Sequence, residues 1–227
     1  MNLLVLGKGK TGALVAEVAQ ERGHRVRALS SADNAGGKAL TWDALAGVDV
    51  VIDFTTPHAV LENIAHCVRA GAAMVVGTTG WYDKIPQVRQ LVEDSDSGFV
   101  FGANFSVGVN IFFDVARAVA PALNLGYTGQ IVERHHAQKK DKPSGTAVAI
   151  NNTFESHSGK KLDIESVREG NIVGDHEIRL RSTNDVITLA HSALSRRGFA
   201  EGAVKAAEWV RSRTGFYDFK DVWRELK

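Results

Sequence analysis

Leu3-Leu4-Val5-Leu6-Gly7-Lys8-Gly9-Lys10-Thr11-Gly12 joins a short apolar run to the pattern G-x-G-x-x-G near the N-terminus. The apolar run predicts a buried strand, and residues 11–22 have the spacing of a helix. Glycines between a strand and a helix permit a tight turn and let the backbone approach a pyrophosphate at the positive end of the helix. We interpret Gly7, Lys8, Gly9, Lys10, Thr11 and Gly12 as a dinucleotide-binding loop, with a plain glycine turn as the alternative.

The first hundred residues continue this alternation of apolar runs and amphipathic segments. Strands are predicted at residues 24–29, 48–53, 73–76 and 98–101, and helices at residues 59–70 and 84–93. Continuous apolar strands that alternate with helices are typical of a parallel sheet with right-handed crossovers. Residues 1–105 are therefore predicted to form a Rossmann-type, dinucleotide-binding α/β domain.

Two loops follow predicted strands of this sheet at their carboxyl ends. Ligands of open α/β sheets bind beyond those ends. The residues predicted to line the cofactor are Gly77, Thr78 and Thr79, and Gly102, Ala103, Asn104 and Phe105. A simple turn is the alternative for each loop.

The segment after the second predicted strand bears on the choice of cofactor. An acid at the tip of that strand binds the ribose of NAD, whereas basic or small polar groups admit the phosphate of NADP. Here the strand continues into Ser30-Ser31-Ala32-Asp33, and Arg27, Lys8 and Lys10 add positive charge. The pattern favours NADPH, while Asp33 leaves NADH open.

The pattern changes after residue 106. A long apolar helix is predicted at residues 107–123 and a strand at residues 129–134, and Pro143 suits the first turn of a helix that reaches residue 157. Alternation at residues 162–168, 176–181 and 185–191 indicates antiparallel strands with one polar face. Residues 106–199 are predicted to form an α+β substrate-binding and oligomerisation domain with an open mixed or antiparallel sheet. Helices at residues 199–213 and 219–226 follow, and the C-terminal segment 200–227 is predicted to pack back on the N-terminal domain.

One segment concentrates the chemistry: Glu133-Arg134-His135-His136-Ala137-Gln138-Lys139-Lys140-Asp141-Lys142-Pro143-Ser144-Gly145-Thr146. Histidine exchanges protons near neutral pH, and the lysines supply positive charge. A Ser-Gly-Thr turn that opens a helix offers backbone N–H groups to an anion. The segment predicts a pocket for a small carboxylate that is protonated during a reaction. The alternatives are a structural histidine pair and simple cross-strand pairing by Glu133 and Arg134. His66, His157, His176 and His191 are interpreted as structural.

Composition limits the possible partners. The 227 residues, 44% hydrophobic and 23% charged, are ordinary for a globular protein, and a net charge of +1 gives no reason to expect nucleic acid or an anionic membrane. Cys67 is the only cysteine and is interpreted as a buried thiol, and no Cys/His spacing predicts a metal site. No run approaches the roughly 20 apolar residues that span a bilayer. A cytoplasmic protein is expected.

These residues resemble the 4-hydroxy-tetrahydrodipicolinate reductase family, also called dihydrodipicolinate reductase, of the diaminopimelate route to lysine. The main resemblance lies in residues 133–146. It extends to Asp53-Phe54-Thr55, Gly77-Thr78-Thr79-Gly80, Asn104-Phe105-Ser106-Val107-Gly108-Val109-Asn110, Arg168-Glu169-Gly170, Gly174-Asp175-His176 and Ser195-Arg196. It therefore covers nearly the whole chain.

The resemblance implies an NADPH- or NADH-dependent oxidoreductase that reduces a cyclic imine carrying two carboxylates. It assigns proton transfer to His135 and Lys139. It assigns substrate binding to His136, Ser144, Gly145 and Thr146. Family members usually form homotetramers through the open sheet, and many carry an acid where this chain has Ser30-Ser31.

Two other functions are compatible with part of the pattern. Another NAD(P)H-dependent reductase or amino-acid dehydrogenase of the same two-domain plan would share the glycine loop without needing the segment 133–146. A non-catalytic module that senses the dinucleotide would not need Lys139.

Overall fold

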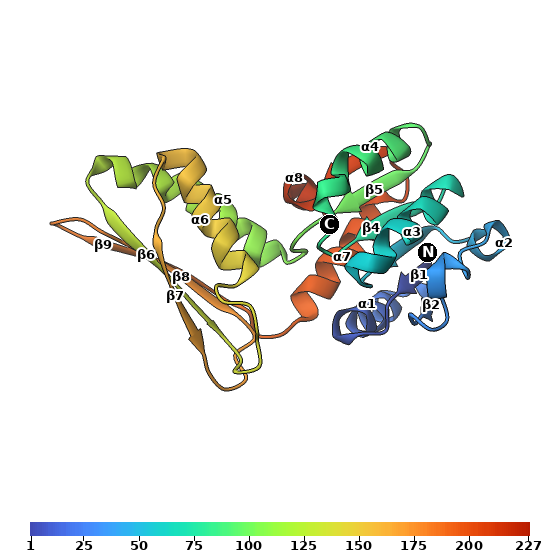
Figure 1. Ribbon diagram of the computed structural model, residues 1–227, viewed down its shortest axis with the longest axis horizontal. Coiled ribbons are helices and arrows are strands. Elements are labelled where there is room, and N and C mark those ends of the chain that lie inside the picture. The colour runs from blue at the N-terminus through green and yellow to red at the C-terminus, as the bar shows by residue number, and fades with distance from the viewer. The chain divides into compact units, whose positions relative to one another are not determined.

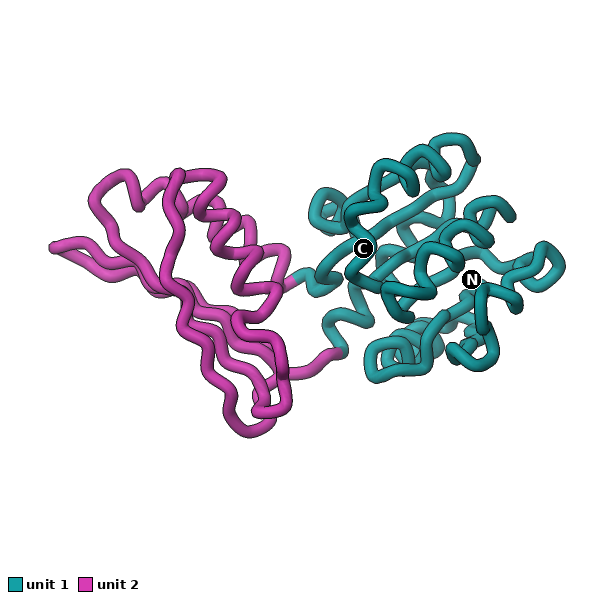
Figure 2. Tube along the Cα trace, in the orientation of Figure 1, with its two compact units in different colours: residues 1–107, 197–227 teal, residues 108–196 magenta.

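The computed structural model describes residues 1–227 and divides the chain into two compact units (Figure 1). Unit 1 comprises Met1–Val107 and Arg197–Lys227, and unit 2 comprises Gly108–Arg196. Figure 2 shows that the chain leaves unit 1 once and returns to it once. Unit 1 is therefore discontinuous in sequence.

Unit 1 is built on a six-stranded parallel sheet with the spatial order β10-β5-β4-β3-β1-β2. The strands are β1 (Asn2–Leu6), β2 (Arg25–Leu29), β3 (Val50–Asp53), β4 (Ala73–Val76), β5 (Gly98–Phe101) and β10 (Gly215–Asp218). The central strands are buried along almost their whole length. Strands β2 and β3 are consecutive in sequence but lie on opposite sides of β1, so the direction of the strand order reverses between β1 and β3.

Helices cover both faces of this sheet, which explains its continuous apolar strands. Helices α1 (Lys10–Glu21) and α7 (Arg197–Val210) contribute to one apolar cluster, and α3 (Pro57–Arg69) and α4 (Ile85–Glu93) contribute to the other. The short elements are α2 (Trp42–Leu45), α8 (Phe219–Val222) and the 3₁₀ turns η1 (Ala35–Gly37), η2 (Tyr82–Lys84) and η4 (Trp223–Glu225).

The C-terminal segment completes unit 1. Helix α7 packs closely on the core: a Cβ atom at Gly202 would lie 1.8 Å from the carbonyl oxygen of Phe105. Strand β10 pairs with β5 at the sheet edge and was not predicted from the sequence. The predicted helix at residues 219–226 is instead a single α-helical turn followed by a 3₁₀ turn.

Unit 2 contains a four-stranded mixed sheet with the order β7-β6-β8-β9. Its strands are β6 (Thr128–His135), β7 (Asp163–Arg168), β8 (Asp175–Arg181) and β9 (Val186–Ser192). Helices α5 (Val107–Val119) and α6 (Gly145–Ser158), with η3 (Ala120–Leu125), share one apolar cluster with β6 and β8 (Figure 1). The Rossmann-type sheet of unit 1 and the mixed sheet of unit 2 confirm the predicted fold class.

Three local predictions for unit 2 are wrong. Residues 163–168 pair in parallel with β6, because period-two alternation identifies the faces of a strand but not its direction. Pro143 precedes the N-cap residue Ser144 and so lies outside the first turn of α6. Helix α5 ends at Val119 and continues as a 3₁₀ turn that contains Pro121.

None of the helices combines the length and the apolar composition needed to cross a bilayer. The single cysteine, Cys67, is fully buried in α3, and burial raises the pKa of its thiol. A thiol in this setting is a packing group, as its sequence context predicted.

Candidate functional site

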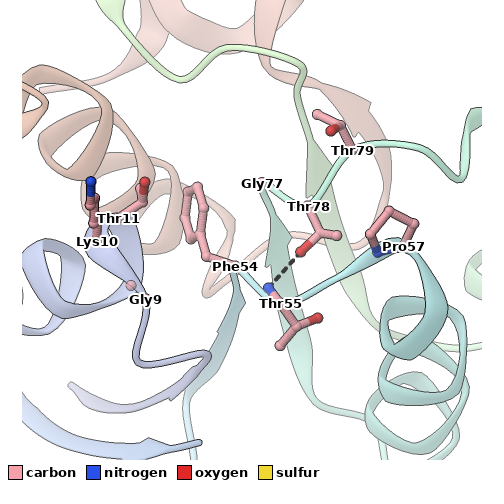
Figure 3. Close-up of a pocket in the computed structure, with 10 residues that line it drawn as sticks. Gly9, Lys10, Thr11, Phe54, Thr55, Pro57, Gly77, Thr78 and Thr79 are labelled. Atoms are coloured by element: carbon pink, nitrogen blue, oxygen red, sulfur yellow. Dashed lines mark hydrogen bonds between the residues drawn. The ribbon is translucent and has the colours of Figure 1, made fainter. Parts of the chain in front are cut away.

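The loops after β1 and β3 lie where the strand order reverses, which is the position at which open α/β sheets bind ligands. A cavity of about 270 Å³ opens there (Figure 3). Its lining residues are Gly9, Lys10, Thr11, Gly12, Phe54, Thr55, Pro57, Gly77, Thr78 and Thr79. The cavity brings together the glycine loop and residues 77–79, both predicted to bind the cofactor.

The three glycines of the loop have different steric surroundings. At Gly7 φ is +97°, and a Cβ atom would lie 2.2 Å from the carbonyl oxygen of Phe54. At Gly12 a Cβ atom would lie 1.9 Å from the carbonyl oxygen of Gly7. A Cβ atom at Gly9 would meet nothing within 4 Å. Gly7 and Gly12 therefore allow close backbone packing, whereas Gly9 leaves open space beside the cavity.

Helix α1 begins at this space with Gly9 as its N-cap and without a side-chain cap. The N–H groups of a first helical turn lack partners within the helix, and the helix dipole favours an anion there. A pyrophosphate fits this arrangement. The residues present therefore suit a dinucleotide cofactor.

A buried carboxylate fixes the cavity wall formed by Thr55 and Thr78. Oδ1 of Asp53 accepts hydrogen bonds from the Thr55 N–H (3.0 Å), the Thr55 hydroxyl (2.7 Å) and the Thr78 hydroxyl (2.6 Å), while Oδ2 accepts one from Asn63. Thr78 Oγ1 also accepts a hydrogen bond from the Thr55 N–H at 2.7 Å (Figure 3). Burial raises the pKa of Asp53, and the donors oppose this effect. The network holds both threonines in one orientation.

Other residues predicted to contact the cofactor do not line this cavity. Gly7 is buried under the loop, and the exposed Lys8 reaches Asp33. Gly102, Ala103 and Asn104 follow β5, and Phe105 is buried in the core with its ring 4.5 Å from that of Phe219. Cofactor contacts at residues 102–105 stay predictions.

The loop after β2 brings an acid back to the tip of the strand. Asp33 Oδ2 accepts hydrogen bonds from the Ser30 N–H at 2.8 Å and the Ser30 hydroxyl at 2.7 Å, and it lies 3.3 Å from Lys8 Nζ. The bonds from Ser30 and then the Lys8 charge lower the pKa of Asp33 to about 2. A carboxylate therefore stands at the strand tip although the residue directly after β2 is serine.

In unit 2, a group of polar residues lies on the helix-covered face of the sheet, just beyond the apolar core. Residues two apart on a strand share a face, so Glu133 and His135 follow the core residue Ile131 along β6. The strand registers place His176 of β8 opposite Glu133, and Arg168 of β7 opposite His135. Four polar side chains thus meet at the end of the core, beside the start of α6.

Glu133 lies at the centre of this group and is fully buried. Its carboxylate accepts hydrogen bonds from Arg168 at 2.9 and 2.7 Å and from the Ser144 N–H at 3.2 Å, and it lies 2.5 Å from His135 Nδ1. Burial opposes its ionisation, but hydrogen bonds from Arg168, Ser166 and His135 outweigh this effect and lower the pKa of Glu133 to about 2. The buried anion is fully paired.

The pKa of both histidines of the group is lowered. Burial lowers the pKa of His135 more than Glu133 raises it. Burial, followed by the nearby His135, lowers the pKa of His176 to about 4. The rings lie 5.2 Å apart, and His176 Nε2 lies 3.1 Å from Ser144 Oγ. His176, interpreted from sequence as structural, therefore belongs to the cluster.

Lys139 and His136 lie in the loop between β6 and α6. Lys139 Nζ lies 2.8 Å from Asp141 Oδ1, and its charge is one cause of the lowered pKa of His135. The His136 N–H donates to the carbonyl of Ile172 at 2.7 Å. The loop thus keeps an ammonium group near the imidazole of His135.

Ser144 is the N-cap of α6, and its hydroxyl accepts a hydrogen bond from the Ala147 N–H at 3.2 Å. Gly145 and Thr146 form the first helical positions, where N–H groups have no partner within the helix. A carboxylate fits these two donors. Ser144 itself acts as a cap and as a partner of His176.

Two sequence models of one family match nearly the whole chain. The model described as Dihydrodipicolinate reductase, N-terminus, matches residues 1–105, and the model described as Dihydrodipicolinate reductase, C-terminus, matches residues 108–223. The chain belongs to the dihydrodipicolinate reductase family. The resemblance stated from the sequence is thereby confirmed.

Named relatives of this family align over most of the chain. The 4-hydroxy-tetrahydrodipicolinate reductase of Christiangramia forsetii is 34% identical over 240 residues, covering 100% of this chain and 99% of the relative. That of Neisseria meningitidis is 38% identical over 198 residues, covering 78% and 73%. A dipicolinate-bound dihydrodipicolinate reductase from Paenisporosarcina sp. TG-14 has the same fold, with a TM-score of 0.80, 22% identity and coverage of 98% and 99%.

The dihydrodipicolinate reductase fold assembles Glu133, Arg168 and His176 around His135, and sequence reasoning missed this group. One signal was present, because the spacing of Glu133 and His135 puts them on one strand face. The partner Arg168 lies 35 residues away, and only the pairing of β6 with β7 brings it to Glu133. Glu133 thus pairs across strands, as the alternative interpretation of this residue expected.

In this dihydrodipicolinate reductase family member, the free energy of unfolding is expected to fall as the pH decreases from 6.5 to 4. His176 has a pKa of about 4 in the folded chain, against an ordinary 6.5, so only the unfolded chain binds its proton in this window. This proton uptake by the unfolded chain lowers the free energy of unfolding by about 3 kcal/mol at pH 4. Denaturant titrations across the window measure it.

His176→Gln is expected to flatten this pH dependence, whereas His157→Gln, at an exposed position of α6, is expected to keep it. Equal slopes in the two variants would contradict the assignment to His176.

Proposed function

We propose that the chain catalyses the NAD(P)H-dependent reduction of 4-hydroxy-tetrahydrodipicolinate to tetrahydrodipicolinate, in the diaminopimelate route to lysine. Membership of the family supports the reaction, and the dipicolinate bound to the Paenisporosarcina protein supports a ring dicarboxylate as the ligand. The observation that carries the proposal in this chain is the grouping of His135 and Lys139 beside the free N–H groups of Gly145 and Thr146.

Each of these residues has a role in the proposed reaction. Loss of the ring hydroxyl as water gives a C=C bond conjugated with the C=N bond. When bound, the reduced nicotinamide would supply a hydride to the far carbon of this conjugated system. Negative charge then develops on the ring nitrogen, and the Lys139 ammonium donates a proton to it, a step worth roughly 10²–10⁴-fold in rate. His135 takes part in proton transfer at the ring. Gly145 and Thr146 bind one carboxylate, and His136 contributes to binding the substrate.

The test is to mix the protein with NADPH and the product of dihydrodipicolinate synthase, and to follow the absorbance of the reduced nicotinamide. Oxidation well above a control without protein is expected. Folded protein that leaves the NADPH intact would reject the proposal. Turnover of a different imine or amino acid alone would favour another reductase of the same plan, and cofactor binding without any turnover would favour a sensing module.

We propose that the site accepts both cofactors and prefers NADPH. Lys8 and Lys10 supply positive charge near the loop, and the Asp33 carboxylate is already engaged by Ser30 and Lys8. Lys8 is free to exchange its exposed contact with Asp33 for a phosphate of the cofactor, and Asp33 remains an acceptor for a ribose hydroxyl.

Lys8→Ala is therefore expected to weaken NADPH binding by roughly tenfold and NADH binding much less. Asp33→Asn is expected to act in the opposite direction, lowering the affinity for NADH only. Dissociation constants from the quenching of protein fluorescence measure both. Equal losses for the two cofactors in both variants would contradict this specificity.

We propose that the chain forms a homotetramer through the sheet of unit 2. Helices cover one face of this sheet, whereas the other face carries exposed side chains of β8 and β9, including Arg179, Val186 and Thr188. Sedimentation equilibrium should give four times the chain mass of 24.5 kDa. Val186→Glu is expected to lower that mass, and a monomeric wild-type protein would contradict the proposal.

A further inference from the structure

The hydrogen bonds around Glu133 determine which ring nitrogen of His135 carries a proton. An ionised carboxylate only accepts hydrogen bonds, and Glu133 has its pKa lowered to about 2. His135 Nδ1 lies 2.5 Å from Glu133 Oε2. That nitrogen must therefore carry the hydrogen and donate it to Glu133.

The other ring nitrogen, Nε2, is then a lone-pair acceptor in the neutral ring. Burial lowers the pKa of His135, and so do the charges of Lys139 and Arg168, while Glu133 raises it. His176, which packs against the same ring, is also neutral at pH 7. The net effect of these groups is a pKa of His135 below the ordinary value, so the ring is neutral at pH 7.

Gly174 adjoins Nε2 and adds no side chain there. A Cβ atom at Gly174 would lie 3.0 Å from it, closer than most real contacts. No hydrogen bond within the chain engages Nε2, whereas Nδ1 is engaged by Glu133. The acceptor nitrogen is therefore the one left for a ligand.

Arg168 makes this arrangement rigid. Its guanidinium donates to both oxygens of Glu133 and to the carbonyl of Asp141, in the loop that carries Lys139. Glu133 also accepts the Ser144 N–H at the start of α6. One buried ion pair thus connects the strand of His135, the loop of Lys139 and the helix start of Gly145.

We propose that Glu133, held by Arg168, is a positioning residue that fixes His135 as the Nδ1–H tautomer and presents Nε2 to the substrate as an acceptor. His135 then accepts a hydrogen bond or a proton at the ring, and Lys139 is the group that donates the proton. The effect on turnover rests on the proposed reductase function, whereas the tautomer itself does not.

The tautomer is measured without substrate, by ¹⁵N NMR of the wild-type protein labelled at histidine, with His135→Gln used to assign the signal. The expected spectrum at neutral pH has a protonated Nδ1 and an unprotonated Nε2. A protonated Nε2, or a doubly protonated ring, would overturn the proposal whether or not the protein reduces any substrate.

Glu133→Gln tests the role of the carboxylate, because the amide can donate as well as accept. The expected results are loss of the single tautomer, a fall in kcat of about 10- to 100-fold with little change in KM for NADPH, and a shift of the acid limb of kcat/KM to lower pH. The shift has this sign because removal of the negative charge disfavours the protonated imidazole. Glu133→Asp, which keeps the charge, is expected to restore part of kcat.

Glu155→Gln is the matched control, since Glu155 is an exposed carboxylate on α6 of the same unit and pairs with Lys161. It is expected to leave the His135 spectrum and the pH profile unchanged. Circular dichroism checks the fold of each variant. A folded Glu133→Gln protein with the wild-type tautomer and pH profile would overturn the proposal, and if that variant fails to fold, the wild-type spectrum decides.

Discussion

Lys139→Ala is expected to lower kcat by 10²–10⁴-fold while the affinity for NADPH stays near the wild-type value. The ammonium group is the cationic acid of the cluster, and its removal leaves the developing charge on the ring nitrogen without a proton donor. Cofactor binding is expected to survive because Lys139 belongs to unit 2, whereas the cavity with the glycine loop belongs to unit 1. Steady-state kinetics at saturating cofactor, with a separate binding titration, measure the two effects.

Lys140→Ala provides the control for Lys139→Ala. Lys140 carries the same charge one residue away, but its side chain is exposed and has no ion-pair partner within 4.0 Å. The kcat of Lys140→Ala is expected to remain within about twofold of wild type, because an isolated surface charge has little interaction energy with the rest of the protein. Turnover of Lys139→Ala near the wild-type rate would show that the proton comes from elsewhere.

Gly12→Ala is expected to abolish dinucleotide binding and to destabilise unit 1. The new Cβ atom would lie 1.9 Å from the carbonyl oxygen of Gly7, so α1 and the glycine loop must separate. Overpacking of this kind costs roughly 1–3 kcal/mol or more, because backbone atoms cannot rotate away as a side chain does. Thermal denaturation and fluorescence titration with NADPH measure the two losses.

Gly9→Ala separates the steric effect on the fold from the effect on the ligand. A Cβ atom at Gly9 meets nothing within 4 Å, and φ is −72°, which alanine adopts without strain. The variant is expected to melt like the wild type and to bind NADPH more weakly, because the methyl group enters the space at the start of α1. A Gly12→Ala protein with wild-type melting and affinity would contradict the assignment of this loop.

The sequence was most informative where one local property determined the structure. The buried strands of unit 1 are apolar because helices cover both faces, so runs such as Val50–Asp53 were visible without knowledge of their neighbours. Strand β10 escaped prediction because it is short and begins at Gly215, where φ is +115°. Its partner β5 lies more than a hundred residues earlier, and only that pairing identifies it as a strand.

The sequence predicted which residues of segment 133–146 form the candidate site, but not the hydrogen bonds that join them to other strands. His135, Lys139 and the Ser144 helix start lie within ten residues, so their association was visible in the chain. The contacts of Glu133 with Arg168, and of Ser144 with His176, depend on strand pairings that local patterns do not specify. The turn that brings Asp33 back to the tip of β2 likewise depends on a hydrogen bond from the Ser30 N–H, which the sequence pattern did not reveal.

The interruption of unit 1 by unit 2 has a consequence for synthesis on the ribosome. Residues 108–196 form one uninterrupted segment, so this unit has all its strands and helices available as soon as that segment emerges. The nucleotide-binding unit, in contrast, lacks α7 and its edge strand until residue 218 has been translated. During elongation its first hundred residues expose apolar surface that α7 later covers, and surface of this kind favours aggregation until the helix has been made.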